Sequence, residues 1–98
     1  MSEVLYPRPT RTLAEKRRGK AVFADGALSA KSKEMITVAV AHVTQCPYCT
    51  DSHTKAASAE GATPEELMEA IWVAAEMRAG AAYAHSTLAL AALEPKSS

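Results

Sequence analysis

The stretch EMITVAVAHVTQCPYCTDSH, residues 34–53, decides both the fold and the chemistry expected of this 98-residue chain. It contains both cysteines of the chain, Cys46 and Cys49, separated by two residues. Glu34 lies twelve residues before the first cysteine, and His53 lies four residues after the second. Packing alone does not explain four reactive side chains within so short a stretch.

The second half of this stretch predicts the start of a helix. Pro47 suits the first helical position, because proline has no amide hydrogen to lose there. We therefore expect a helix from Pro47 to Glu60, with Gly61 just past its end. Residues 46, 49 and 53 differ by three and four, so their side chains share one face of this helix. The free amides and the dipole at its N-terminus would lower the pKa of a cysteine placed there.

The residues before Cys46 predict a buried helix. Apolar side chains recur at intervals of three and four, at Met35, Ile36, Ala39, Val40 and Val43. With a cap at Ser29, this pattern favours a helix over residues 30–44. The many β-branched residues leave a short strand as the alternative.

Capping signals define the remaining elements. Thr12-x-x-Glu15 is a capping box for a helix from about Leu13 to Phe23, which Asp25-Gly26 would end. Thr63-Pro64-Glu65-Glu66 marks another helix start. We expect a break at Gly80 and a last helix from Ala81 to Leu93, before Pro95. No segment alternates as strands do, so the fold class is all-α, with about five helices and no sheet.

The length fits a single domain over residues 1–98, with its core at about 28–93, an extended lead at 1–9 and a tail at 95–98. A chain this small buries only about 60 to 65% of its unfolded surface, so we expect a homo-oligomer. Trp72, Tyr83 and Leu88 would lie at a subunit interface or fill the monomer core; the pattern favours neither.

Charge and composition indicate which partners and which cellular compartment to expect. Basic and acidic residues are equal in number, and we interpret the basic residues near the start as a solvated helix face. Nucleic-acid and membrane partners are not expected. The N-terminus lacks the pattern of a secretory leader, and no apolar run reaches the ~18 residues that span a bilayer, so a cytoplasmic protein is predicted. In a reducing compartment, a Cys-x-x-Cys pair indicates redox, catalytic or metal chemistry.

The four residues at 34, 46, 49 and 53 suit thiol chemistry. His53 could take or return the proton of Cys49, and Glu34 could orient the imidazole. Two thiols at this spacing can close into a disulfide after one is oxidised to a sulfenic acid. Zinc is an alternative, since the four residues could supply four ligands, although structural zinc sites usually bring two ligand pairs. His42, His85 and Tyr48 are weaker candidates for the site.

The peptide Cys46-Pro47-Tyr48-Cys49 resembles the active-site string of glutaredoxins. That fold needs further strands and a cis-proline loop, and it leaves Glu34 and His53 unexplained. The whole pattern instead resembles the alkylhydroperoxidase D (AhpD-like) group of the carboxymuconolactone decarboxylase family. Glu34, Cys46, Cys49 and His53 match its signature at every spacing, and the similarity extends over about residues 28–90.

This resemblance implies an all-helical fold, assembly into trimers or hexamers, and thiol-dependent reduction of a peroxide or disulfide by an unknown thiol reductant. It also implies roles: Cys49 attacks, Cys46 resolves, and His53 with Glu34 relays the proton, with neither a cofactor nor a metal. Tyr48 stands where some members have a histidine, and longer members carry an additional helical region. A zinc-stabilised interaction domain and a redox sensor or scaffold without turnover are the alternative functions.

Overall fold

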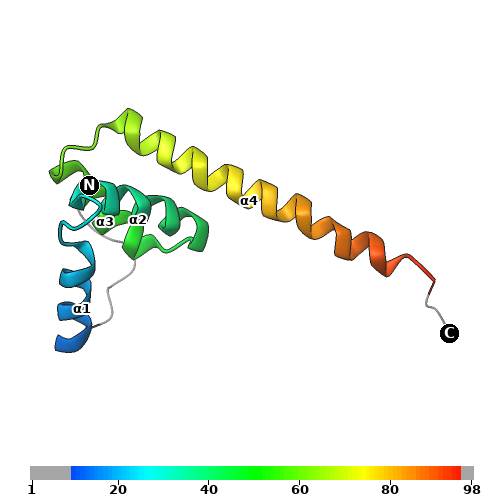
Figure 1. Cartoon of the computed structure of the whole chain (residues 1–98), viewed down its shortest axis with the longest axis horizontal. Helices are drawn as coiled ribbons and strands as arrows, with labels where there is room; N and C mark the ends of the chain where they lie inside the picture. The colour runs from blue at the N-terminus through cyan, green and yellow to red at the C-terminus, as the bar shows by residue number, and fades with distance from the viewer. Residues whose placement is uncertain (1–9, 96–98) are drawn as a thin grey trace.

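The computed structural model of the chain describes residues 10–95 and consists of four helices (Figure 1). These are α1 (Leu13–Phe23), α2 (Ala30–Thr44), α3 (Pro47–Ala59) and α4 (Pro64–Ala92). No strand occurs within residues 10–95, so the all-α prediction is confirmed. The expected lead at 1–9 and most of the expected tail lie outside the described residues.

The helices begin where the capping residues predict. The Thr12 side chain accepts a hydrogen bond from the N–H of Glu15, and the Glu15 carboxylate accepts one from the N–H of Thr12. Thr63 and Glu66 form the same reciprocal pair at the start of α4. Each pair satisfies amides that have no partner inside the helix, which fixes these two helix starts.

The expected break at Gly80 is absent, because α4 continues through it as one helix of 29 residues. A glycine inside a helix costs about 1 kcal/mol relative to alanine, but it leaves the hydrogen-bond ladder intact. Alanines on both sides of Gly80 favour the helix and outweigh this cost. The two helices expected there are therefore one.

The turn between α2 and α3 depends on Gln45, which adopts a left-handed conformation with φ 57°. Its N–H and that of Cys46 both donate to the carbonyl oxygen of Ala41, which closes the last turn of α2. The chain then reverses within two residues and enters α3 at Pro47. This sharp turn places the first turn of α3 next to the end of α2.

The core lies where α2, α3 and the first half of α4 meet. Its buried residues are Val38, Ala57 and Ala62, and the half-buried side chains packed on them are Met35, Leu67 and Ile71. Val38 is the one large side chain in residues 10–95 that is fully buried. Small alanines allow the helix backbones to approach closely, but they bury little apolar area per residue.

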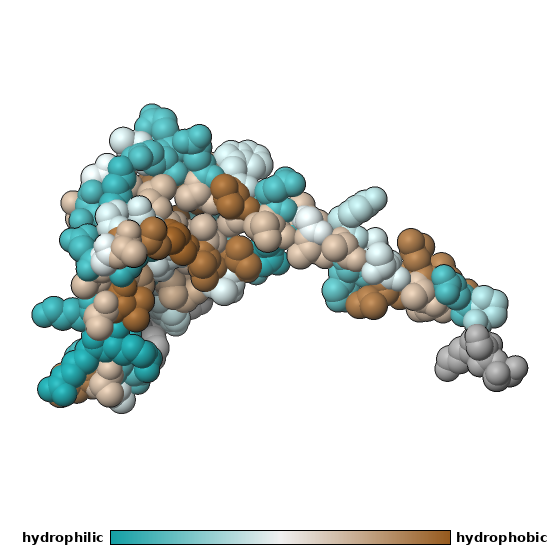
Figure 2. Space-filling view, viewed as in Figure 1, coloured by the Kyte–Doolittle hydropathy of each residue, from teal (hydrophilic) through white to brown (hydrophobic). Residues whose placement is uncertain are grey.

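The molecule is elongated because α4 extends far beyond the other helices (Figure 1). The radius of gyration is 18.2 Å, whereas a compact domain of this length has about 13 Å. Beyond Arg78, whose guanidinium donates to the carbonyl oxygen of Val43, every described residue except Ser86 is exposed. On the face that Figure 2 shows, apolar side chains of this protruding part of α4 lie at the surface.

No helix within residues 10–95 combines the length and apolar character needed to cross a membrane.

Candidate functional site: two cysteines beside a histidine–glutamate pair

Cys46 is the N-cap residue of α3, and its sulfur accepts a hydrogen bond from the N–H of Cys49 at 3.3 Å. The Sγ atoms of the two cysteines lie 2.6 Å apart, and both residues are thiols. Both are partly exposed. The Cys-x-x-Cys spacing thus places the two sulfurs in direct contact at a helix N-terminus, where a thiolate is stabilised.

The acidity of Cys46 follows from these contacts. The hydrogen bond from the Cys49 side chain holds the pKa of the Cys46 thiol below its ordinary value, and the backbone N–H of Cys49 acts in the same direction. Partial desolvation opposes this shift, and the backbone N–H of Tyr48 adds to it. The N-cap cysteine therefore carries a thiolate at lower pH than an ordinary cysteine does.

His53 lies one turn further along α3 and pairs with Glu34 from α2, with 2.7 Å between His53 Nδ1 and Glu34 Oε2. The Glu34 side chain is 9% exposed, so it is almost entirely buried behind the imidazole. Because an ionised carboxylate only accepts hydrogen bonds, Nδ1 donates and Nε2 is left to bind or release a proton. The Phe23 ring packs against the imidazole, with 5.0 Å between the ring centroids.

A cleft of about 550 Å³ opens over these groups. Cys46, Cys49 and His53 all line it, together with Tyr48 and Ser52 from α3. Residues of α1 form its opposite side. The structure therefore brings the two thiols and the imidazole to one accessible surface, while Glu34 holds His53 from behind.

The weaker candidates fall in different places. Tyr48 lines the cleft, whereas His85 lies on the exposed part of α4 that projects from the body. His42 bonds through Nδ1 to the carbonyl oxygen of Val38 at 2.8 Å and lines a separate, more open depression that also reaches Cys46. Sequence reasoning missed Phe23, because no spacing rule relates the end of α1 to a residue of α3.

The strand alternative for the residues before Cys46, which would give the strand-to-helix arrangement of glutaredoxins, does not apply. The segment before Cys46 is helix α2, and the described residues contain no cis peptide bond. Among residues 10–95, no group of three or more histidine, cysteine, aspartate or glutamate side chains is arranged to hold a metal ion. His53 Nδ1 and Glu34 are instead bonded to each other.

Fold and site together define a small all-α protein with adjacent thiols at a helix N-terminus, beside a buried histidine–glutamate pair. The chain belongs to the carboxymuconolactone decarboxylase family, whose model matches residues 13–92. This family includes enzymes, among them decarboxylases and peroxidases.

Several proteins are similar to the chain. A Paracoccus denitrificans protein named "Uncharacterized protein 4 in cox locus" is 53% identical, with 96% of each chain covered. An uncharacterized protein of Cupriavidus necator is 39% identical over 74% of this chain and 64% of its own length. A crystal structure of a protein from Methanobacterium thermoautotrophicum has a TM-score of 0.71 and 36% sequence identity, covering 83% of this chain and 88% of its own.

Proposed function

We propose that this protein is a thiol-dependent peroxidase or disulfide reductase of the alkylhydroperoxidase type. The observation that carries the proposal is the contact of two thiols, 2.6 Å apart, in the same cleft as a histidine that a buried glutamate holds. This arrangement gives each of the four residues a distinct task. Neither alternative gives the four residues distinct tasks.

In the first step, His53 takes the proton of Cys49, and the Cys49 thiolate attacks the terminal oxygen of an organic hydroperoxide. A sulfur–oxygen bond forms and the oxygen–oxygen bond breaks. The alkoxide receives the proton from His53 and leaves as an alcohol, while Cys49 becomes a sulfenic acid. Glu34 stabilises the imidazolium that exists between these proton transfers.

In the second step, the Cys46 sulfur attacks the sulfenic sulfur of Cys49. The disulfide forms, the sulfur–oxygen bond breaks, and the departing hydroxide takes up the proton that Cys46 has released, which gives water. Two thiols and one hydroperoxide thus become one disulfide, one alcohol and one water. An external dithiol then reduces the disulfide and is itself oxidised.

The lowered pKa of Cys46 suits the resolving role, because resolution needs a thiolate next to the oxidised sulfur. The same acidity would also serve an attacking cysteine. His53 distinguishes the two residues, since it follows Cys49 by one turn on the same helix face. We therefore assign the attack to Cys49.

Turnover of cumene hydroperoxide with dithiothreitol tests the proposal. The wild type is expected to consume hydroperoxide catalytically. Cys49→Ser should lose both turnover and formation of a sulfenic acid, whereas Cys46→Ser should form a sulfenic acid on Cys49 but lose rapid disulfide closure. A sulfenic acid on Cys46 in the Cys49→Ser variant would reverse the two roles.

We also propose that copies of the chain assemble into a trimer or hexamer through the projecting part of α4. Its exposed apolar side chains include Tyr83 at 83% and Leu93 at 82% exposure. Large apolar side chains are enriched at subunit interfaces, where a partner covers them. Assembly would cover a helix that the single chain leaves almost wholly in solvent.

The two alternatives make different predictions. A zinc-stabilised domain would carry stoichiometric zinc when it is purified without chelator. A redox sensor would change its assembly on oxidation while hydroperoxide turnover stays absent. Metal analysis and the turnover assay therefore separate all three functions.

A further inference from the structure

One side of the cleft over the two thiols is strongly basic. Lys16 and Lys20 line it from α1, and Arg11 lines it from the residues just before α1, opposite the cysteines at the start of α3. None of the described residues that line the cleft is an aspartate or glutamate. The described basic residues between positions 11 and 20 are solvent-exposed, as expected, but three of them also line the cleft.

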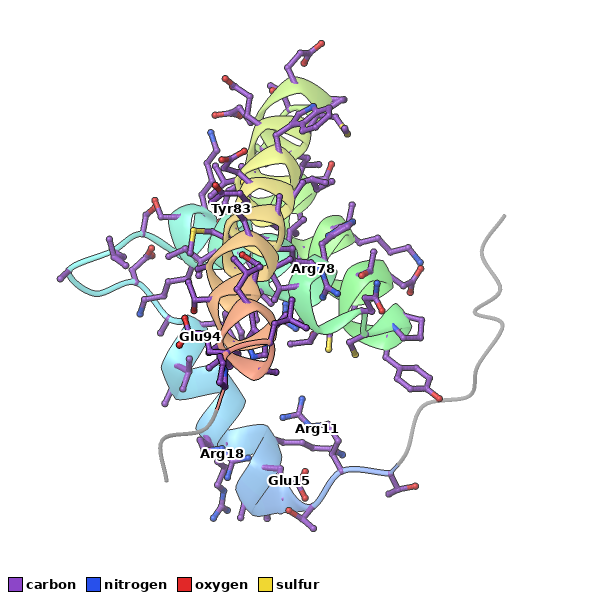
Figure 3. The ribbon with its side chains drawn as sticks, turned by 90° about the vertical axis from the view of Figure 1, so that its right-hand side faces the viewer. Arg11, Glu15, Arg18, Arg78, Tyr83 and Glu94 are labelled. Atoms are coloured by element: carbon purple, nitrogen blue, oxygen red, sulfur yellow. The ribbon has the colours of Figure 1, made fainter. Side chains whose placement is uncertain are left out.

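The Arg11 side chain contacts α1, which begins two residues later. Its Nη2 donates to the carbonyl oxygen of Glu15 at 3.2 Å. The guanidinium passes over Gly19, where an added Cβ would lie only 3.3 Å from Nη2. Figure 3 shows the Arg11 side chain, just before α1, pointing toward the other helices, whereas Arg18 on α1 points away from them. A glycine inside α1 costs helix stability but leaves room for this arginine.

Within the described residues, no carboxylate pairs with Lys16 or Lys20. Among residues 10–95, ion pairs with carboxylates form at Lys31 and Lys55, but not at Lys16 or Lys20. A concave surface with several charges of one sign concentrates ligands of the opposite sign. The α1 side of the cleft is therefore a favourable place for an anion.

The remaining walls suit an apolar group. Phe23 and Tyr48 contribute aromatic rings, and the volume of about 550 Å³ accommodates a small organic molecule. A ligand that fills this cleft would place its anionic end on α1 and its organic body against the rings. Arginine favours a carboxylate in particular, because its planar fork matches the two carboxylate oxygens.

We propose that the cleft selects organic hydroperoxides that carry a carboxylate, which Arg11, Lys16 and Lys20 bind while the hydroperoxide group reaches Cys49. The substrate class in this proposal rests on the peroxidase function proposed above. The positive electrostatic potential of the cleft can be measured without turnover.

Alkylation of a single thiol provides that measurement. In a Cys46→Ser background, Cys49 is the remaining cysteine, and it lines the basic cleft. Iodoacetate and iodoacetamide differ in charge but alkylate thiolates in the same way. We expect the ratio of their rates, iodoacetate over iodoacetamide, to exceed the ratio for a small model thiol, and to fall as salt is added.

Single charge removals locate the source of the field. Arg11→Gln, Lys16→Gln and Lys20→Gln should each lower the ratio by about two- to fivefold, the range of exposed charge interactions. Arg18→Gln removes the same charge from the same helix outside the cleft, so the ratio should not change. Equal effects of all four substitutions, or no effect of any, would overturn the proposal.

Turnover of a matched pair then tests the substrate class. We expect a higher kcat/KM for para-carboxycumene hydroperoxide than for cumene hydroperoxide, and a loss of this preference in Lys16→Gln but not in Arg18→Gln. Equal turnover of both compounds would refute the carboxylate preference and leave the peroxidase function standing. Absence of turnover with both would refute the peroxidase function, and with it the substrate class, even if the alkylation ratio showed a positive cleft.

Discussion

At the scale of single residues, Cys46 combines two tasks. As N-cap of α3 it satisfies the N–H of Cys49, and the hydrogen bonds it receives lower its pKa. A hydroxyl or carboxylate normally fills this position. A thiolate here both caps the helix and acts as the reactive group. The stability of the start of α3 is thereby coupled to the redox state of the site.

The pH dependence of Cys46 tests this coupling. Its alkylation by iodoacetamide, followed at the peptide level by mass spectrometry, should show a midpoint below the ordinary value of about 8.5. Cys49→Ala removes the largest cause of the shift and should raise the midpoint. An identical midpoint in both proteins would contradict the assigned cause.

The sign of the effect on stability follows from the same shift. Because the pKa of Cys46 is lower in the folded protein, its thiolate stabilises the reduced protein fully above the unfolded pKa. This contribution is lost as the pH falls through the folded pKa. Cys46→Ser should remove that part of the pH dependence.

At the scale of helices, the sequence predicted the helix bounds that depend on local capping residues. The bounds of α1 and α2 and the caps at Thr12, Ser29 and Thr63 agree with the structure. The expected break at Gly80 was wrong because glycine permits a break without requiring one. The position of Phe23 against His53 depends on tertiary packing, which periodicity does not reveal.

Gln45 offers a test of the turn that positions the site. Its left-handed conformation costs a residue with a Cβ about 1–2 kcal/mol. Gln45→Gly removes this strain but adds entropy to the unfolded chain, so we expect a net gain of about 0.5–1 kcal/mol. Chemical denaturation measures the change. Gln45→Ala keeps the Cβ and should give no such gain, and an equal gain in both would contradict the explanation.

At the scale of the whole molecule, the single chain leaves many of its apolar side chains exposed. Its core is small, and the projecting part of α4 carries apolar side chains that nothing in residues 10–95 covers (Figure 2). The site itself depends on α1, α2 and α3, so assembly through α4 would stabilise the body without covering the cleft.

The assembly proposal is tested by two leucines with equal exposure. Leu88 on α4 and Leu13 on α1 are both 62% exposed. Leu88→Glu should shift the wild-type oligomer toward monomers in analytical ultracentrifugation, because a charge is costly in an apolar interface. Leu13→Glu should leave the oligomer intact. A monomeric wild type, or equal dissociation in both variants, would contradict the interface.

The most direct test of the proposed function is the stoichiometry of a single oxidation. Reduced protein is mixed with one equivalent of cumene hydroperoxide, and the products are identified by mass spectrometry of the alkylated peptides and by quantifying the alcohol. We predict one disulfide between Cys46 and Cys49 and one alcohol for each chain. Two thiols that stay reduced while the hydroperoxide persists would contradict the peroxidase function.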